Sequence, residues 1–236
     1  MMMRQLFSLL IILFAMPVMA EEMSAGFELS KTTVDPTDIA SIKRGAKFFA
    51  TNCMSCHTMV YLKYDKIAKE AGITYDKMPV NVKTWPYGVT PPDLSLEADV
   101  RGTDWVYTYL HSFYQDTKRP TGANNLLVPN TAMPNIVGPY QGEQVKLDEP
   151  VTNMFGTYHW YDAIKQTKGG TMSANQFDES IRDVVNFLDY AAEPFKAEQQ
   201  RLGVWVLAFI VFLGVMFYFL KREYWKDIKK TKHRKE

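Results

Sequence analysis

The chain has 236 residues, with 27 Lys and Arg against 26 Asp and Glu, which gives a formal net charge of +1. The charge is unevenly spread, because residues 21–200 carry 17 basic and 23 acidic side chains, a balance of −6, whereas residues 201–236 carry 9 basic and 3 acidic ones. An acidic main segment argues against nucleic acid binding and favours a cationic partner, although acidity of this size would also serve solubility alone.

Residues 1–20 have the composition of a secretory signal peptide. Arg4 precedes an apolar run from Leu6 to Met16, and Ala20 supplies the small residue of a cleavage site. An N-terminal membrane anchor is the alternative, but this run is too short to cross a bilayer. We therefore predict export with cleavage after Ala20, followed by one domain over residues 21–201, which is long enough for a single substantial core.

The first helix is predicted to run from Ile39 into Cys53, with Thr37 or Asp38 as its N-cap. It leads into the sequence CMSCH at 53–57, which holds both cysteines of the chain. Two cysteines of an exported protein usually form a disulfide, but a bond across two intervening residues closes too small a loop to brace a domain. A redox dithiol would need a βαβ context, and a structural zinc site would need four ligands.

The pattern C-x-x-C-H is the signature of covalent haem attachment. Each thiol then forms a thioether with a vinyl group of the haem, and the adjacent imidazole ligates the iron from one face. We predict that Cys53 and Cys56 attach one haem c, and that His57 is the proximal ligand of its iron.

Two further helices are predicted, over Asp104–Phe113 and residues 174–193. The second has Ser173 as its N-cap. Its apolar residues form one stripe: Phe177, Ile181, Val184, Val185 and Leu188. Pro194 follows the stripe and marks a predicted hinge before the C-terminal segment.

Segments 75–100 and 117–172 hold nine of the twelve prolines, so we expect long loops there. Loops of this length inside a compact domain usually wrap a ligand or carry the function. If the iron is not left open for catalysis, its second ligand would be His111, His159 or a methionine. Met133 lies in a proline-stiffened loop that can hold a thioether at low entropic cost. However, most methionines only fill gaps in a core, and packing is the simpler explanation for both histidines.

Residues 202–220 contain no charged side chain. A helix of this length reaches about 28 Å, enough to cross the hydrocarbon core of a membrane, and it lacks the polar face of a soluble helix. The tail at 221–236 contains eight Lys and Arg, which marks the cytoplasmic side, and Tyr218, Tyr224 and Trp225 suit the membrane interface. We therefore predict a single-pass protein of the inner (cell) membrane, with its main domain in the periplasm and its C-terminus in the cytoplasm.

Five sequence segments together resemble the cytochrome c1 family of proteobacteria. They are CMSCH at 53–57, PPDLS at 91–95, RGTDWVYTYL at 101–110, NTAMPN at 130–135 and AAEP at 191–194. They occur in the family's order, the likeness covers essentially the whole mature chain, and a single anchor follows the last segment. Cytochrome c1 is the haem subunit of the cytochrome bc1 complex, the ubiquinol–cytochrome c reductase.

The resemblance implies a mainly α fold of the cytochrome c class, plus one C-terminal transmembrane helix. In such a fold the first and last helices pack across each other beside the haem, and long loops close over it. It also implies Met133 as the sixth iron ligand and Arg101 near a haem propionate. Two departures concern the propionate contacts. Relatives often carry R-x-R here, but position 99 is Asp, and residues 83–94 lack the Asn-Gly-Gly that many relatives place before PPDLS.

The implied function is electron relay in a respiratory chain. A Rieske iron–sulfur protein would pass one electron to this haem, and the haem would pass it to cytochrome c. Cytochrome b and membrane lipid would be further partners. No independent catalysis is expected of the chain. Met/His ligation raises the reduction potential relative to two histidines, as a late acceptor requires. Two alternatives remain: a haem peroxidase-type enzyme with an open iron position, and a membrane-tethered cytochrome c that serves a terminal oxidase.

Overall fold

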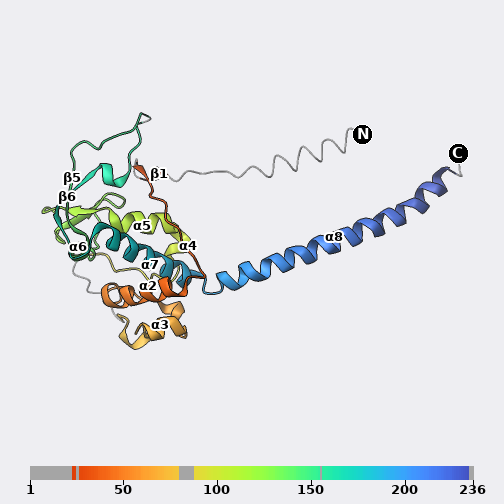
Figure 1. The fold of residues 1–236 in the computed structure, drawn as a ribbon, viewed down its shortest axis with the longest axis horizontal. Helices are drawn as coiled ribbons and strands as arrows, with labels where there is room; N and C mark the ends of the chain where they lie inside the picture. Colours follow the sequence, from red (N-terminus) through yellow and green to blue (C-terminus); the bar gives the residue numbers. More distant parts are fainter. Residues whose placement is uncertain (1–22, 25–26, 80–87, 155, 234–236) are drawn as a thin grey trace.

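The computed structural model describes residues 23–24, 27–79, 88–154 and 156–233, so the predicted signal peptide at 1–20 lies outside the described residues. The centre of the domain is formed by α2 (Ile39–Asn52), α4 (Glu97–Arg101), α5 (Thr103–His111) and α7 (Ala174–Ala192). Around them lie α3 (Lys66–Glu70), α6 (Gly138–Gln141) and the 3₁₀ turns η1 (Val60–Leu62), η2 (Tyr75–Lys77) and η3 (Trp160–Asp162). The long α8 (Lys196–His233) projects away from this domain (Figure 1). The predicted mainly α fold is confirmed.

Helices α2 and α7 cross in direct backbone contact. A Cβ atom added to Gly45 of α2 would lie 1.9 Å from the carbonyl oxygen of Asp183 and 2.8 Å from the Cβ of Phe187, both in α7. Only glycine, which has no Cβ, allows this approach. Beside it, Arg44 donates from Nε and Nη2 to the two carboxylate oxygens of Asp183 at 2.6 and 2.8 Å. The first and last helices of the domain therefore pack across each other as expected.

The predicted starts of both helices are confirmed by their caps. The carboxylate of Asp38 accepts a hydrogen bond from the N–H of Ser41 at 2.9 Å, which caps α2. At the start of α7, Ser173 and Gln176 form a reciprocal capping box. The apolar stripe of α7 is buried along its whole length, at Phe177, Ile181, Val184, Val185 and Leu188. It packs into a core that also contains Ile42, Ala46 and Phe49 of α2.

The prediction of long loops over 75–100 and 117–172 is wrong in part, because α4 begins in the first segment and α6 lies in the second. Short antiparallel hairpins lie in and next to these segments: β3 (Phe113–Gln115) with β4 (Ala123–Asn125), and β5 (Gly142–Lys146) with β6 (Ile164–Gly169). A further hairpin joins β1 (Met23–Ser24) to β2 (Phe27–Glu28). Among the described prolines of these segments, Pro120 lies between β3 and β4 and Pro150 between β5 and β6, while Pro139 lies in the first turn of α6, where proline is well tolerated. Helix α5 ends at His111 because Phe113 already pairs with Asn125 of β4.

Helix α8 contains a stretch, Lys196–Lys226, that is long and apolar enough to cross a membrane. Its large apolar side chains are exposed, in contrast to those of α7. The helix begins before the predicted span at 202–220 and continues through most of the predicted tail to His233. Residues 193–195 separate it from α7, so the helical path breaks at the predicted hinge, Pro194.

Candidate haem site

A cavity of about 400 Å³ opens between α2, α5, α7 and two long connections of the domain. Its volume falls in the usual range for a small-molecule or cofactor pocket. Much of its wall is apolar: Phe49, Leu94, Val106, Leu110, Ile136, Val184 and Leu188. The predicted site residues Cys53, Cys56, His57, Arg101 and Met133 all line it, although they come from separate segments of the chain.

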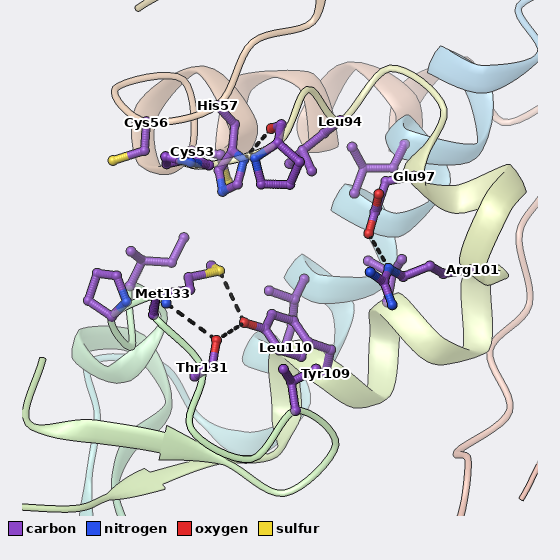
Figure 2. Close-up of a pocket in the computed structure, with 18 of the residues that line it drawn as sticks. Cys53, Cys56, His57, Leu94, Glu97, Arg101, Tyr109, Leu110, Thr131 and Met133 are labelled. Carbon is purple, nitrogen blue, oxygen red and sulfur yellow. Dashed lines mark hydrogen bonds and ion pairs between the residues drawn. The ribbon is translucent and has the colours of Figure 1, made fainter. Parts of the chain in front are cut away.

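Both thiols lie in a turn that continues from the end of α2. The N–H of Cys53 donates to Phe49 at 2.8 Å, and the N–H of His57 donates to the carbonyl oxygen of Cys53 at 2.9 Å. This turn brings Cys53, Cys56 and His57 to one side of the cavity (Figure 2). Both cysteines are free. Among the described residues, no group of three or more His, Cys, Asp and Glu side chains could hold a metal ion, so the zinc interpretation gains no further ligands there.

The imidazole of His57 is oriented by backbone. Its Nδ1 lies 2.8 Å from the carbonyl oxygen of Pro92. Because a carbonyl oxygen can only accept, Nδ1 carries the proton and Nε2 keeps its lone pair. Burial lowers the pKa of His57 by more than the bond to Pro92 raises it, so the ring is neutral at pH 7. A neutral imidazole with a free nitrogen is the form that ligates a metal.

Asp93, in the PPDLS segment, ties this backbone to the residues that follow His57. Its carboxylate accepts hydrogen bonds from the hydroxyl of Thr58 at 2.5 Å, the N–H of Val60 at 3.0 Å and the N–H of Ser95 at 2.9 Å. Sequence reasoning did not identify this role. The sequence feature that could have indicated this role is an Asp two residues before a Ser, because an Asp side chain commonly bonds the backbone N–H two residues on.

Met133 lies across the cavity from His57 (Figure 2). The hydroxyl of Tyr109 donates to its sulfur at 3.5 Å. The Oγ1 of Thr131 lies 2.9 Å from this hydroxyl and accepts from the N–H of Met133 at 3.3 Å. Burial raises the pKa of Tyr109 to about 12, so the hydroxyl stays protonated and can donate. Sequence reasoning missed Tyr109, because its partner lies 24 residues away.

Arg101 lies at a third side of the cavity, with half of its side chain exposed. Its Nε donates to the carboxylate of Glu97 at 2.5 Å, and its guanidinium lies 4.4 Å from the ring centre of Trp105. The cation is thus available at the edge of the cavity, but it already has an acidic partner. Asp99 does not belong to the described cavity wall.

The two other histidines considered as iron ligands lie outside the described cavity wall. His111 is 4% exposed, bonds the carbonyl oxygen of Tyr107 through Nδ1 at 2.8 Å and packs edge-on against Phe177. His159 stacks on Tyr161 and lies 3.5 Å from a carboxylate oxygen of Glu28. Both are engaged in packing and local polar contacts.

Comparison with known proteins assigns the family. Residues 29–85 and 72–228 match the model described as the Cytochrome C1 family. The chain is also 40% identical over 223 residues to cytochrome c1 of Allochromatium vinosum, an alignment that covers 86% of this chain and 91% of that protein. The chain belongs to the cytochrome c1 family. Membership gives it a haem c cofactor and a role in respiratory electron transport.

Two other relatives carry different names. The protein named ammonia monooxygenase gamma subunit of Nitrosomonas europaea is 35% identical over 245 residues, covering 96% of this chain and 100% of that protein. The mitochondrial cytochrome b-c1 complex catalytic subunit of Candida albicans is 23% identical over 234 residues, covering 84% of this chain and 75% of that protein.

The residues around the cavity fit the cofactor of the cytochrome c1 family. Two thiols stand beside a neutral imidazole, a thioether sulfur faces them, and the wall between is largely apolar. Soft sulfur and imidazole groups suit haem iron, and an apolar wall suits the porphyrin ring.

Proposed function

We propose that Cys53 and Cys56 hold one haem c through thioether bonds and that His57 and Met133 are the two axial ligands of its iron. The observation that supports this proposal is the position of the imidazole and the thioether on opposite sides of one cavity, with both thiols beside the imidazole (Figure 2). A bound haem supplies a centre that takes up and releases one electron. The carbonyl oxygen of Pro92 fixes which imidazole nitrogen is free for iron.

Arg101 is proposed to lie near a haem propionate. Its half-exposed guanidinium at the cavity edge is a suitable cation for that group. Because Glu97 already accepts from Arg101 at 2.5 Å, the propionate would share the arginine with this carboxylate. The Asp at position 99, where relatives often carry a second arginine, leaves Arg101 as the cation of this motif.

The role that follows is the haem subunit of a quinol–cytochrome c reductase. In this proposal the chain accepts an electron from a Rieske iron–sulfur protein and passes it to cytochrome c, while cytochrome b is its partner within the membrane. The Candida albicans relative is named as a subunit of the cytochrome b-c1 complex, which supports assembly of this chain into such a complex. No catalysis by the isolated chain is expected.

The proposed arrangement in the cell follows from the two ends of the chain. Residues 1–20 direct export, 21–201 form the periplasmic haem domain, the apolar span at 202–220 crosses the inner membrane, and 221–236 lie in the cytoplasm. The exposed apolar surface of α8 supports the anchor. Protease added to spheroplasts should digest the haem domain and spare the tail, whereas the reverse pattern would refute this orientation.

Other haem functions have less support. A peroxidase-type enzyme needs an open iron position, whereas in the proposed ligation Met133, which lines the cavity, fills that position. A tethered cytochrome c that serves an oxidase would use the same ligands, so only its partners would distinguish it. The Nitrosomonas relative suggests another alternative, assembly with ammonia monooxygenase subunits, because the similarity extends over the whole of that protein.

Purification of the chain from its native membranes, in mild detergent, tests the assembly. We expect a b-type cytochrome and a Rieske iron–sulfur protein to co-purify with it, together with quinol–cytochrome c reductase activity. Co-purification with a terminal oxidase, or with other ammonia monooxygenase subunits, would replace this assignment by the corresponding alternative. An isolated chain with peroxidase activity would contradict the electron-relay role altogether.

A further inference from the structure

The loop that carries Met133 turns at an unusual backbone conformation. Asn130, three residues earlier, has φ 65°, and it is the one non-glycine residue with a positive φ in the described part of the chain. A left-handed conformation is unfavourable for residues with a Cβ, although Asn tolerates it better than most. The loop keeps this corner because its surroundings hold it there.

Two side chains of the β3–β4 hairpin bond the corner residue. Asn124 of β4, only 6% exposed, accepts from the N–H of Asn130 through its side-chain oxygen at 2.8 Å. Arg119, in the turn between the strands, donates from Nη2 to the carbonyl oxygen of Asn130 at 2.8 Å and from Nη1 to its Oδ1 at 3.3 Å. Both backbone polar groups of the corner are therefore bonded to one hairpin.

The hairpin that provides these bonds is itself well anchored. Asn124 also accepts from the N–H of Asn125 at 2.9 Å and donates to the carboxylate of Asp116 at 3.0 Å. Asn125 is fully buried, accepts from the N–H of Leu127 at 2.9 Å and donates to the carbonyl oxygen of Tyr109 at 2.8 Å. The support of the loop thus continues into α5, whose Tyr109 hydroxyl bonds the sulfur of Met133.

We propose that Arg119 and Asn124 are positioning residues that hold Met133 at the haem iron. The inference rests on the proposed function, because it requires Met133 to be an iron ligand. A loop that is ordered in advance loses little entropy on ligation, so the thioether is harder to displace. Neither residue is part of the described cavity wall, so both act through Asn130.

The test measures how fast added imidazole displaces Met133 from the oxidised haem. The displacement is monitored by the loss of the weak sulfur-to-iron band at the red end of the spectrum. Arg119→Gln and Asn124→Ala remove the bonds to Asn130 from opposite sides of the corner. Each lost hydrogen bond should speed displacement about 2- to 12-fold. Arg119→Lys keeps the charge without the paired donors and should give an intermediate rate.

A matched control separates positioning from general stability. Asn186 is also a buried amide, 4% exposed, which bonds Asp35 and the hydroxyl of Ser41 away from the Met133 loop. Asn186→Ala should lower the melting temperature without changing the displacement rate. An equal acceleration in this control, or wild-type rates in both Arg119→Gln and Asn124→Ala, would overturn the inference.

A further variant distinguishes failure of the inference from failure of the proposed function. Met133→Leu should abolish the sulfur-to-iron band and lower the reduction potential. If the band persists in Met133→Leu, both the proposed ligation and the positioning role are wrong. If it disappears while the hairpin variants behave as wild type, only the positioning role is wrong.

Discussion

His57 donates from Nδ1 to the carbonyl oxygen of Pro92 at 2.8 Å, a bond that joins two motifs 35 residues apart in the sequence. The segment of Pro92 is in turn held by Asp93, whose carboxylate bonds Thr58 and Val60 directly after the imidazole. The orientation of the proposed proximal ligand therefore depends on a carboxylate outside the described cavity wall.

The first prediction concerns the pH dependence of this contact. Burial raises the pKa of Asp93, but hydrogen bonds from Ser95, Thr58 and Val60 together outweigh this effect and hold the pKa below its ordinary value. A carboxyl group with a lowered pKa stabilises the folded state above its unfolded pKa, and this stability is lost as the pH falls through the folded pKa. Asp93→Asn should therefore be less stable than wild type at pH 7, and this difference should shrink as the pH falls from 7 through the lowered folded pKa of Asp93.

Thermal unfolding of both proteins across this pH range measures the effect. Asp148→Asn, a change at an exposed carboxylate, is the control and should leave the pH profile unchanged. A stability difference between Asp93→Asn and wild type that does not vary with pH would show that the charge of Asp93 is not involved.

The second prediction concerns the crossing of α2 and α7. A Cβ at position 45 would lie 1.9 Å from the carbonyl oxygen of Asp183, so Gly45→Ala must push the two helices apart. Overpacking of this kind costs about 1–3 kcal/mol or more in free energy of unfolding. Denaturant unfolding should show this loss, whereas Lys47→Ala on the exposed face of α2 should stay within about 0.5 kcal/mol of wild type. Equal stability of Gly45→Ala and wild type would refute the close approach.

The third prediction concerns the hydroxyl of Tyr109, which donates to the sulfur of Met133 at 3.5 Å. This bond withdraws electron density from the proposed ligand, and its loss makes the sulfur a better donor to oxidised iron. Tyr109→Phe should therefore lower the reduction potential by about 20–60 mV, the equivalent of one hydrogen bond. Tyr140→Phe removes a hydroxyl that bonds Asn52 instead, and it should leave the potential unchanged in a redox titration. A potential that rises or stays constant in Tyr109→Phe would contradict this role.

The fourth prediction concerns covalent attachment through Cys53 and Cys56. Mass spectrometry of the mature chain should show one added haem that survives acid–acetone extraction. The double change Cys53→Ser and Cys56→Ser should remove this addition, because a serine oxygen forms no thioether. Met133→Leu is the matched control and should retain the covalent haem. Extractable haem in the wild-type protein would contradict covalent attachment through these cysteines.

The fifth prediction concerns the charge of the haem domain. Residues 21–200 carry a balance of −6, which should attract a basic cytochrome c. Charges across a solvated interface are screened over about 8 Å at physiological salt, so the attraction acts mainly on the association rate. Oxidation of the reduced protein by a soluble basic cytochrome c should slow steeply as ionic strength rises, while the reduction potential barely changes. A rate independent of salt would mean that the acidity serves solubility.

Helices α2 and α7 were predictable because their signals are local. Asp38 and Ser173 are caps that act within one turn, and the stripe of α7 repeats with the helical period. The β3–β4 hairpin was missed for the opposite reason. Asn124 and Asn125 are poor strand formers, and their amides bond residues on the neighbouring loop and helix that no local pattern indicates.

The candidate site shows the same division. Cys53, Cys56 and His57 form one short motif, so their proposed roles were predictable from the sequence. The contributions of Pro92 and Tyr109 were not, because one acts through its carbonyl oxygen and the other across 24 residues. Local sequence also could not separate Met133 from His111 and His159, since the difference lies in which side chain the fold turns toward the cavity.

The elbow between α7 and α8 has a mechanical consequence. Only residues 193–195 separate the two helices, and Lys196 bonds Asp189 at 2.8 Å and Glu193 at 3.4 Å across the junction. Because the junction is short and held by these ion pairs, a rotation of α8 is transmitted to α7. Helix α8 has 38 residues and is about 57 Å long, so a tilt of about 10° moves one end sideways by about 10 Å relative to the other. With α8 as the proposed anchor, a change in its tilt within the bilayer would therefore also turn the domain and its cavity relative to the membrane surface.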